Sequence, residues 1–201
     1  MAVAPYIEAQ YWKDHINGMI INDLKDGIFG NVLFIGCNHG AEVEVAWELC
    51  ENATSLNGLD IDNDALSFAY RRKVGNFFAH DIRQKLPDEP KYDTIISFHT
   101  LEHFDDEELK TVVDNIYAAL NKGGLVIVSV PYLHAYPTTE HKQFFDHKSL
   151  RKAFNKFDVT HCQRDDRVDK HGNKHDVITL MARKNFNENR ISSNSNNPVS
   201  A

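Results

Sequence analysis

One stretch, residues 31–62, constrains the fold of this chain more than any other. It begins with a short apolar run, Val32–Ile35, which stops at two glycines, Gly36 and Gly40. Apolar residues at helical spacing follow, and a second apolar segment ends at Asp60. This order of strand, glycine turn, helix and strand is typical of a βαβ unit in a parallel sheet. Open sheets of this kind bind ligands at the carboxyl ends of their strands, so we expect a ligand site here.

The residue types at these strand ends favour a nucleoside. Gly36 and Gly40 have no side chain, so the main chain there can approach a ligand closely. The first turn of the following helix offers free N–H groups and a partial positive charge. Asp60 is placed to accept hydrogen bonds from a ribose diol. The alternative is that the two glycines only form a tight turn between strand and helix, and it stays open because short glycine motifs are weak.

The rest of the chain continues to alternate strands with helices. Helices are expected at 6–25, 63–73, 105–120 and 148–156, and strands at 76–79, 92–98, 125–130, 157–162 and 177–182. This order predicts an α/β sheet with an antiparallel edge. We expect one domain over residues 1–184, with a helical cap at 1–28 and an irregular aromatic loop at 132–147. The polar segment 185–201 is expected to be a disordered tail.

The composition argues against several classes of protein. The formal net charge is -7, whereas broad nucleic-acid binding requires a basic surface. No apolar stretch is long enough to span a bilayer, and the N-terminus lacks the features of a signal peptide. The three cysteines, Cys37, Cys50 and Cys162, form no disulfide framework and no metal motif. We therefore expect a cytoplasmic protein without a membrane or nucleic-acid partner.

Five segments in the same order resemble the class I S-adenosylmethionine-dependent methyltransferases. They are Val32–Gly40, Gly58–Asp62, His80–Ile82, Tyr92–His103 with Leu120–Gly124, and Glu140–Leu150. The resemblance covers residues 30–183 and implies a doubly wound, Rossmann-like sheet of seven mostly parallel strands with an antiparallel last strand. It also implies S-adenosylmethionine as the cofactor and methyl transfer as the reaction. The last two segments are most similar to the small-molecule branch of the family.

The resemblance also implies a role for each matching position. Residues implied to bind the cofactor are Gly36, Cys37, Asn38 and Gly40 at its methionine part, Asp60 at its ribose, Ile61, His80, Asp81 and Ile82 at its adenine, and Phe98 and His99 near its sulfonium. Two positions depart from the family pattern. Phe34 stands where the family usually carries Asp or Glu, and Asn38 replaces the middle glycine of the loop. Asn tolerates a positive φ better than most residues, so the turn can survive that change.

Methyl transfer from a sulfonium is an in-line displacement, so the protein mainly has to align the acceptor with the methyl group. A poor nucleophile, such as an alcohol or an ammonium, also needs a base, and histidine suits that role near neutral pH. The candidate catalytic residues are His103 and His99, which follow strand 92–98. The candidate substrate-binding residues are Tyr11, Tyr132, His134 and His141. The spacings of the histidines match no compact metal motif, so no metal ligands are predicted.

The sequence therefore predicts a methyltransferase that acts on a hydroxyl or amine of a small molecule. The loop at 132–147 is expected to lie on the acceptor side. Phe34 and Asn38 leave a second reading open, in which the chain keeps the fold as a binding or regulatory protein without turnover. A nicotinamide-dependent oxidoreductase is a weaker alternative, because Asn38 breaks the full G-x-G-x-x-G spacing. A homodimer remains open.

Overall fold

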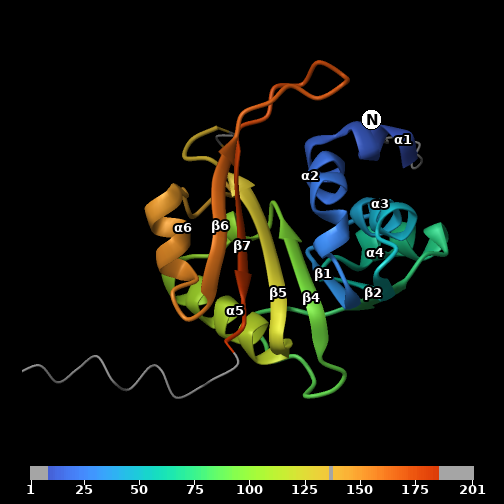
Figure 1. Ribbon diagram of the computed structural model, residues 1–201, viewed down its shortest axis with the longest axis horizontal. Coiled ribbons are helices and arrows are strands. Elements are labelled where there is room, and N and C mark those ends of the chain that lie inside the picture. The colour runs from blue at the N-terminus through green and yellow to red at the C-terminus, as the bar shows by residue number, and fades with distance from the viewer. Residues whose placement is uncertain (1–8, 136–137, 186–201) are drawn as a thin grey trace, which may run out of the picture.

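The computed structural model describes residues 9–135 and 138–185. These residues form a seven-stranded sheet in the order β3-β2-β1-β4-β5-β7-β6, with helices on both faces (Figure 1). The strands are β1 Gly30–Ile35, β2 Ala53–Asp60, β3 Asn76–Ala79, β4 Tyr92–Phe98, β5 Leu120–Pro131, β6 Asp158–Asp165 and β7 Val177–Arg183. The α-helices are α1 Ala9–Asp14, α2 Ile16–Leu24, α3 Ala41–Leu49, α4 Asn63–Ala69, α5 Asp106–Ala119 and α6 His147–Ala153. Short 3₁₀ turns are η1 Lys25–Gly27, η2 Tyr70–Arg72 and η3 Leu101–His103.

The sheet is doubly wound, as predicted. β1 pairs in parallel with both β2 and β4, β2 pairs in parallel with β3, and β4 with β5. β7, the last strand, runs antiparallel to both β5 and β6. The chain moves outward from β1 to β3 and then returns to place β4 on the other side of β1. The order therefore reverses between β1 and β4, which is where such sheets bind ligands.

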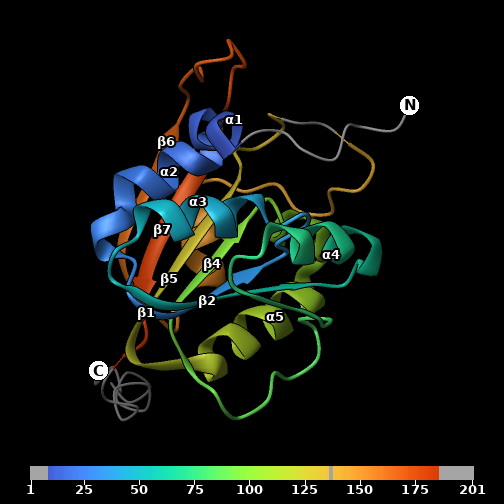
Figure 2. The ribbon, with the colours of Figure 1, turned by 90° about the vertical axis from the view of Figure 1, so that its right-hand side faces the viewer.

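Two apolar layers hold the helices to the sheet, because strand side chains alternate between its faces. Val32 and Phe34 of β1 belong to one buried cluster with residues of α2, α3 and α4. Leu33 and Ile35 belong to the other, with residues of α5 and α6. Figure 2 shows α2, α3 and α4 on one side of the sheet and α5 on the other. No helix among the described residues is both long and apolar enough to cross a bilayer.

The sequence predicts one N-terminal helix over residues 6–25, and the structure has two. The helix breaks at His15, whose backbone is extended (φ -70°, ψ 157°), so that α1 and α2 are separate. The Nδ1 atom of His15 accepts a hydrogen bond from the N–H of Asn17 at 3.4 Å, which caps α2. The helical pattern of apolar residues continues across this break, which is why the pattern alone does not reveal it. Residues 1–8 lie outside the described part of the chain, as do residues 186–201 of the predicted tail.

The other elements follow the predicted order with shifted boundaries. α5 begins as its acidic first turn predicts, and Asp105 and Glu108 form a capping box there. β5 begins at Leu120, earlier than the predicted strand at 125, because the segment containing Gly123 and Gly124 already continues the strand. β2 is also longer than its apolar end suggests, since it starts at Ala53. These changes move no strand to another place in the sheet.

Candidate active site

A cleft of about 340 Å³ opens where the sheet order reverses, at the carboxyl ends of β1, β2 and β4. Its lining includes nine residues that the sequence assigns to the site: Gly36, Asn38, Asp60, Ile61, His80, Asp81, Ile82, His99 and His103. Hollows of about 380 and 480 Å³ lie elsewhere, beside α2 and β6 and between α5 and α6. The convergence of strand ends and polar groups, not the size of the hollow, marks the first as the candidate site.

Asp60 ends β2 with its carboxylate at the cleft. One carboxylate oxygen accepts the N–H of Asn38 at 2.7 Å, and the other accepts the N–H of Asp62 at 2.9 Å. A carboxylate oxygen can accept more than one hydrogen bond, so both oxygens retain capacity for a ribose diol. Asn38 itself has a left-handed backbone (φ 46°), which Asn adopts at modest cost. Asn in place of the family's middle glycine therefore leaves the turn intact, and the hydrogen bond to Asp60 holds the turn in place.

Glycine at position 36 is required by packing as well as by the backbone. Gly36 has a φ of 68°. A Cβ added there would overlap the Thr100 hydroxyl and lie 2.9 Å from the Thr100 methyl carbon. The Thr100 hydroxyl in turn donates to the carbonyl oxygen of Phe98 at 3.0 Å. The loop after β1 thus crosses the segment after β4 at a distance that only glycine permits.

Packing also constrains Gly40, on the side of the buried cluster that contains Phe77. Its φ is 75°, and an added Cβ would lie 2.9 Å from the ring of Phe77. Gly40 does not line the cleft among the residues found there, whereas Gly36 does. Both glycines therefore form a tight turn, and a ligand contact at either of them stays a prediction.

Phe34 does not occupy the cleft. It is buried against the α2–α3 side of the sheet, opposite the layer of α5. Cys37 is also buried there, and burial raises the pKa of its thiol well above its ordinary value. Cys37 therefore contributes main-chain shape, with its N–H bonded to the carbonyl oxygen of Leu59 at 3.0 Å. Neither side chain blocks a ligand at the tip of β1.

Charged residues border the end of the cleft beyond β3. The Arg83 guanidinium donates to both carboxylate oxygens of Asp81, at 3.0 and 2.8 Å, and to Glu108 at 2.8 Å. The Lys142 ammonium donates to the other oxygen of Glu108 at 2.9 Å. Hydrogen bonds from Arg83 lower the pKa of Asp81, and those from Lys142 and then Arg83 lower the pKa of Glu108 to about 2. Both carboxylates are therefore ionised near neutral pH.

Sequence reasoning assigned Asp81 to the adenine but missed its partners. Arg83, Glu108 and Lys142 all line the cleft, and the sequence assigned none of them to the site. Arg83 lies two residues after Asp81, so that spacing is a signal that sequence reasoning can use. Ile61 keeps 62% of its surface exposed beside this end, which leaves an apolar face for a ring.

Histidines also border the cleft. His99 and His103 line it, and the Nδ1 of His103 lies 3.2 Å from the carbonyl oxygen of Glu140. A carbonyl oxygen only accepts, so Nδ1 carries the proton and Nε2 carries the lone pair. The ring of His141 lies at 5.1 Å from that of His103, and partial burial lowers the pKa of His141. Glu102, which sequence reasoning missed, lies buried between His99 and His103.

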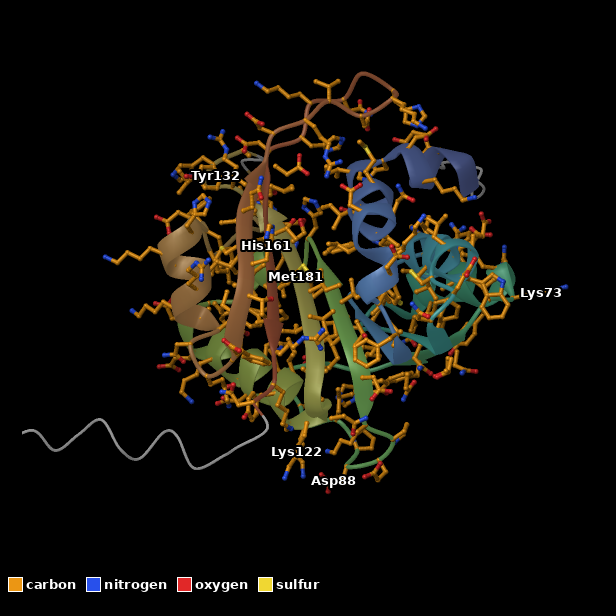
Figure 3. The ribbon with its side chains drawn as sticks, in the orientation of Figure 1. Lys73, Asp88, Lys122, Tyr132, His161 and Met181 are labelled. Atoms are coloured by element: carbon orange, nitrogen blue, oxygen red, sulfur yellow. The ribbon has the colours of Figure 1, made fainter. Side chains whose placement is uncertain are left out.

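The remaining predicted residues lie outside the cleft lining. Phe98 is buried in the core between the sheet and the N-terminal helices. Tyr11 stacks on His171 with ring centres 4.4 Å apart, and His134 lies 4.3 Å from the ring of Phe144. Figure 3 labels Tyr132 near the carboxyl end of β5, where Arg164 of β6 lies 4.4 Å from its ring. Substrate contact by Tyr11, Tyr132 and His134 stays a prediction.

A comparison with protein-family models matches residues 11–164 to a methyltransferase domain. The chain belongs to the class I S-adenosylmethionine-dependent methyltransferases. This match covers β1 to β6 and includes every residue that lines the cleft. No curated protein matches the sequence of this methyltransferase.

Solved structures share its fold at low sequence identity. The N-methyltransferase NodS from Bradyrhizobium japonicum WM9 has a TM-score of 0.69 and 18% identity, over 88% of this chain and 97% of its own. NodS in complex with S-adenosyl-L-homocysteine matches with a TM-score of 0.67 and 18% identity, over 88% and 87%. A chain of the complex between the Haloferax volcanii Trm112 methyltransferase activator and a methyltransferase has a TM-score of 0.71 and 13% identity, over 88% and 93%.

The residues of this methyltransferase fit its cofactor, S-adenosylmethionine. A carboxylate at the tip of β2 faces the cleft, and glycine main chain lines its β1 side. Ile61 and Ile82 offer apolar surface between these groups and the charged end. The side chain that departs most from the family, Phe34, points into the core and leaves the cleft open.

Proposed function

We propose that this methyltransferase transfers a methyl group to a hydroxyl or amine of a small-molecule acceptor. The observation that carries the proposal is Asp60, a carboxylate fixed by two main-chain N–H groups at the tip of β2 and open to the cleft. This arrangement suits a ribose diol. Bound S-adenosylmethionine would supply an activated methyl group on sulfur.

The proposed cofactor contacts follow the cleft from end to end. The main chain of the loop from Gly36 to Gly40, including Cys37 and Asn38, would contact the methionine part of the cofactor. Asp60 accepts from the ribose hydroxyls. Residues that would contact the adenine or the sulfonium are Ile61, His80, Asp81, Ile82 and His99, whereas the buried Phe98 lies outside the cleft lining.

The acceptor is proposed to enter beside His103 and His99. An acceptor bound there would face the methyl group that the cofactor supplies, and the acceptor proton would pass to a base. Nε2 of His103 is prepared for this role, because Nδ1 is held as a donor by Glu140. His99 lines the same wall of the cleft. General base catalysis of this kind contributes roughly 10²–10⁴-fold to the rate.

A small molecule is favoured over a nucleic acid because the net charge of -7 disfavours a nucleic-acid acceptor. An amine acceptor is supported by NodS, which shares the fold and is named an N-methyltransferase. The three cysteines are free thiols, which suits the reducing cytoplasm as the compartment. We propose no membrane partner and leave a homodimer open. The family assignment removes the nicotinamide-dependent alternative from consideration.

Titration calorimetry and labelled methyl transfer test the proposal together. We expect micromolar binding of S-adenosyl-L-homocysteine, no binding of NAD, and transfer of the labelled methyl from S-adenosylmethionine to one component of a metabolite extract. His103→Gln should lower the transfer rate by about 100-fold without changing product affinity. His161→Gln, on the outer strand β6 (Figure 3), is the matched control. Binding without transfer would favour the silent binding protein, and absence of binding would refute the proposal.

A further inference from the structure

Glu102 is a buried carboxylate without a hydrogen-bond partner. Its side chain is 1% exposed, and neither carboxylate oxygen has a hydrogen-bond partner among the described residues. The Nδ1 of His99 lies 3.6 Å from Oε1, which is within ion-pair distance if the imidazole is protonated but beyond hydrogen-bond range. A buried carboxylate is costly unless it is paired or coordinates a metal. Glu102 therefore points to a cationic ligand at this position.

Two imidazoles face the same point. One donor atom each from Glu102, His103 and His141 lies within 4.8 Å of the others. Nε2 of His103 carries a lone pair, because Glu140 holds the proton on Nδ1. An outer hydrogen bond of this type is what fixes a histidine as a metal ligand. One ring nitrogen of each histidine and one carboxylate oxygen of Glu102 thus lie close together.

The main chain holds this cluster together from two distant parts of the sequence. The carbonyl oxygen of Glu102 accepts the N–H of Lys142 at 2.8 Å and that of Gln143 at 3.0 Å. These bonds attach the loop that carries His141 to the turn η3 that carries Glu102 and His103. His141 is therefore placed opposite the other two by backbone geometry and not by side-chain contact alone.

We propose that Glu102, His103 and His141 bind one divalent first-row transition-metal ion at the wall of the cleft. Two imidazoles and one carboxylate form the protein ligands of known zinc sites that keep an open position, and this set favours zinc or cobalt over magnesium. Ligand atoms at about 2.0–2.1 Å from one ion lie about 3.3 Å apart, so separations within the cluster must shorten by at most about 1.5 Å. Spacing along the chain did not predict this site, because His141 lies far from the other two in sequence.

An ion at this position would also affect methyl transfer. His103 lines the cleft, so a bound ion could lower the pKa of an acceptor hydroxyl and present it as a nucleophile. In the metal-bound protein Nε2 of His103 would hold the ion, so His99 would take the base role that the proposed function gives to His103 in the metal-free protein. This role in methyl transfer rests on the proposed function, whereas binding of the ion does not.

The test uses the full chain, freed of metal with a chelator and titrated with zinc or cobalt(II) chloride. We expect calorimetry to detect one tight metal site per chain. The absorption spectrum of bound cobalt(II) should be that of an ion with nitrogen ligands. Glu102→Gln and His141→Ala should each weaken that site by at least about 10-fold, the scale seen when a ligand set is disturbed. His161→Ala should bind as the unchanged protein does. Magnesium chloride in large excess should not compete.

Two further measurements keep the outcome clear. Zinc should raise the Tm of the unchanged protein but not that of Glu102→Gln. Gln has nearly the same shape as Glu, and the Tm of this variant without zinc shows whether it folds. Equal zinc affinity in both, or no tight site at all, would overturn the inference. Binding of S-adenosyl-L-homocysteine is measured on the same metal-free samples. Loss of that binding with the metal site intact would refute the proposed function and leave the metal site standing.

Discussion

At the scale of single residues, Asp60 joins three parts of the proposed site. It holds the loop after β1 through Asn38, holds the start of α4 through Asp62, and faces the cleft. We expect Asp60→Asn to weaken binding of S-adenosyl-L-homocysteine by at least about tenfold, or about 1.4 kcal/mol. The amide nitrogen cannot accept a hydrogen bond, so one main-chain partner or the ribose loses its acceptor.

Calorimetry measures this effect, with Asp64→Asn on the exposed side of α4 as the matched control. Asp64 lies close in sequence but is exposed and does not line the cleft. Unchanged affinity in Asp60→Asn, with the fold intact by circular dichroism, would mean that the ribose lies elsewhere. The residue-scale assignment of Asp60 would then be wrong.

At the scale of elements, the loop after β1 and the segment after β4 depend on each other. Gly36→Ala should destabilise the fold by about 2–4 kcal/mol, because it adds a clash with Thr100 to the strain of a positive φ. In a Thr100→Ala background, the same change should cost at least about 1 kcal/mol less, since the clashing hydroxyl and methyl are gone. Urea unfolding of the four proteins in this cycle measures the coupling. Simple additivity would show that the strain at Gly36 arises from its backbone alone.

The N-terminus of α2 gives a pH dependence. Burial, and then the nearby imidazole of His175, lower the pKa of His15 from 6.5 to about 4. The unfolded chain therefore takes up a proton at His15 between pH 6.5 and 4, while the folded chain does not. Stability from the neutral imidazole is complete above pH 6.5 and is lost as the pH falls toward 4.

Replacement of His15 by Asn tests this expectation. Asn caps helices well and does not titrate, so the free energy of unfolding of His15→Asn should fall less between pH 6.5 and 4. The difference should be about 1–2 kcal/mol, reduced from the full shift because the ring is partly exposed. Urea unfolding at several pH values measures it, with His161→Asn as the exposed control. Parallel pH profiles for the unchanged protein and His15→Asn would contradict the buried, neutral state of His15.

At the scale of the whole molecule, ligand binding and folding should be linked. The cleft gathers residues from β1, β2, the segments after β3 and β4, η3, α5 and the loop before α6, so it exists only when the sheet is assembled. S-adenosyl-L-homocysteine at about 100 times its Kd should stabilise the fold by about 2.7 kcal/mol. That corresponds to a rise in Tm of about 5–10 °C for a chain of this size. NAD should leave the Tm unchanged, and an equal rise with NAD would contradict a site selective for the methyl donor.

Local sequence determined much of this protein. Strand, glycine turn, helix and the carboxylate of Asp60 follow within one short stretch, and their positions depend on side-chain periodicity and on backbone freedom at Gly36 and Gly40. Such features involve residues close along the chain, so a pattern of neighbours is enough to predict them. The break between α1 and α2 is the exception, because His15 interrupts a helix whose apolar pattern continues.

Only the tertiary structure decided which distant residues meet. Thr100 packs against Gly36, and Lys142 bonds to Glu108. His141 lies close to Glu102 and His103. These contacts form because β4, α5 and the loop before α6 come together at one end of the sheet. Each of these contacts depends on strand order and on hydrogen bonds between remote main-chain segments. Periodicity along the chain carries no information about them, since it fixes the face that a residue occupies and not the residue it meets there.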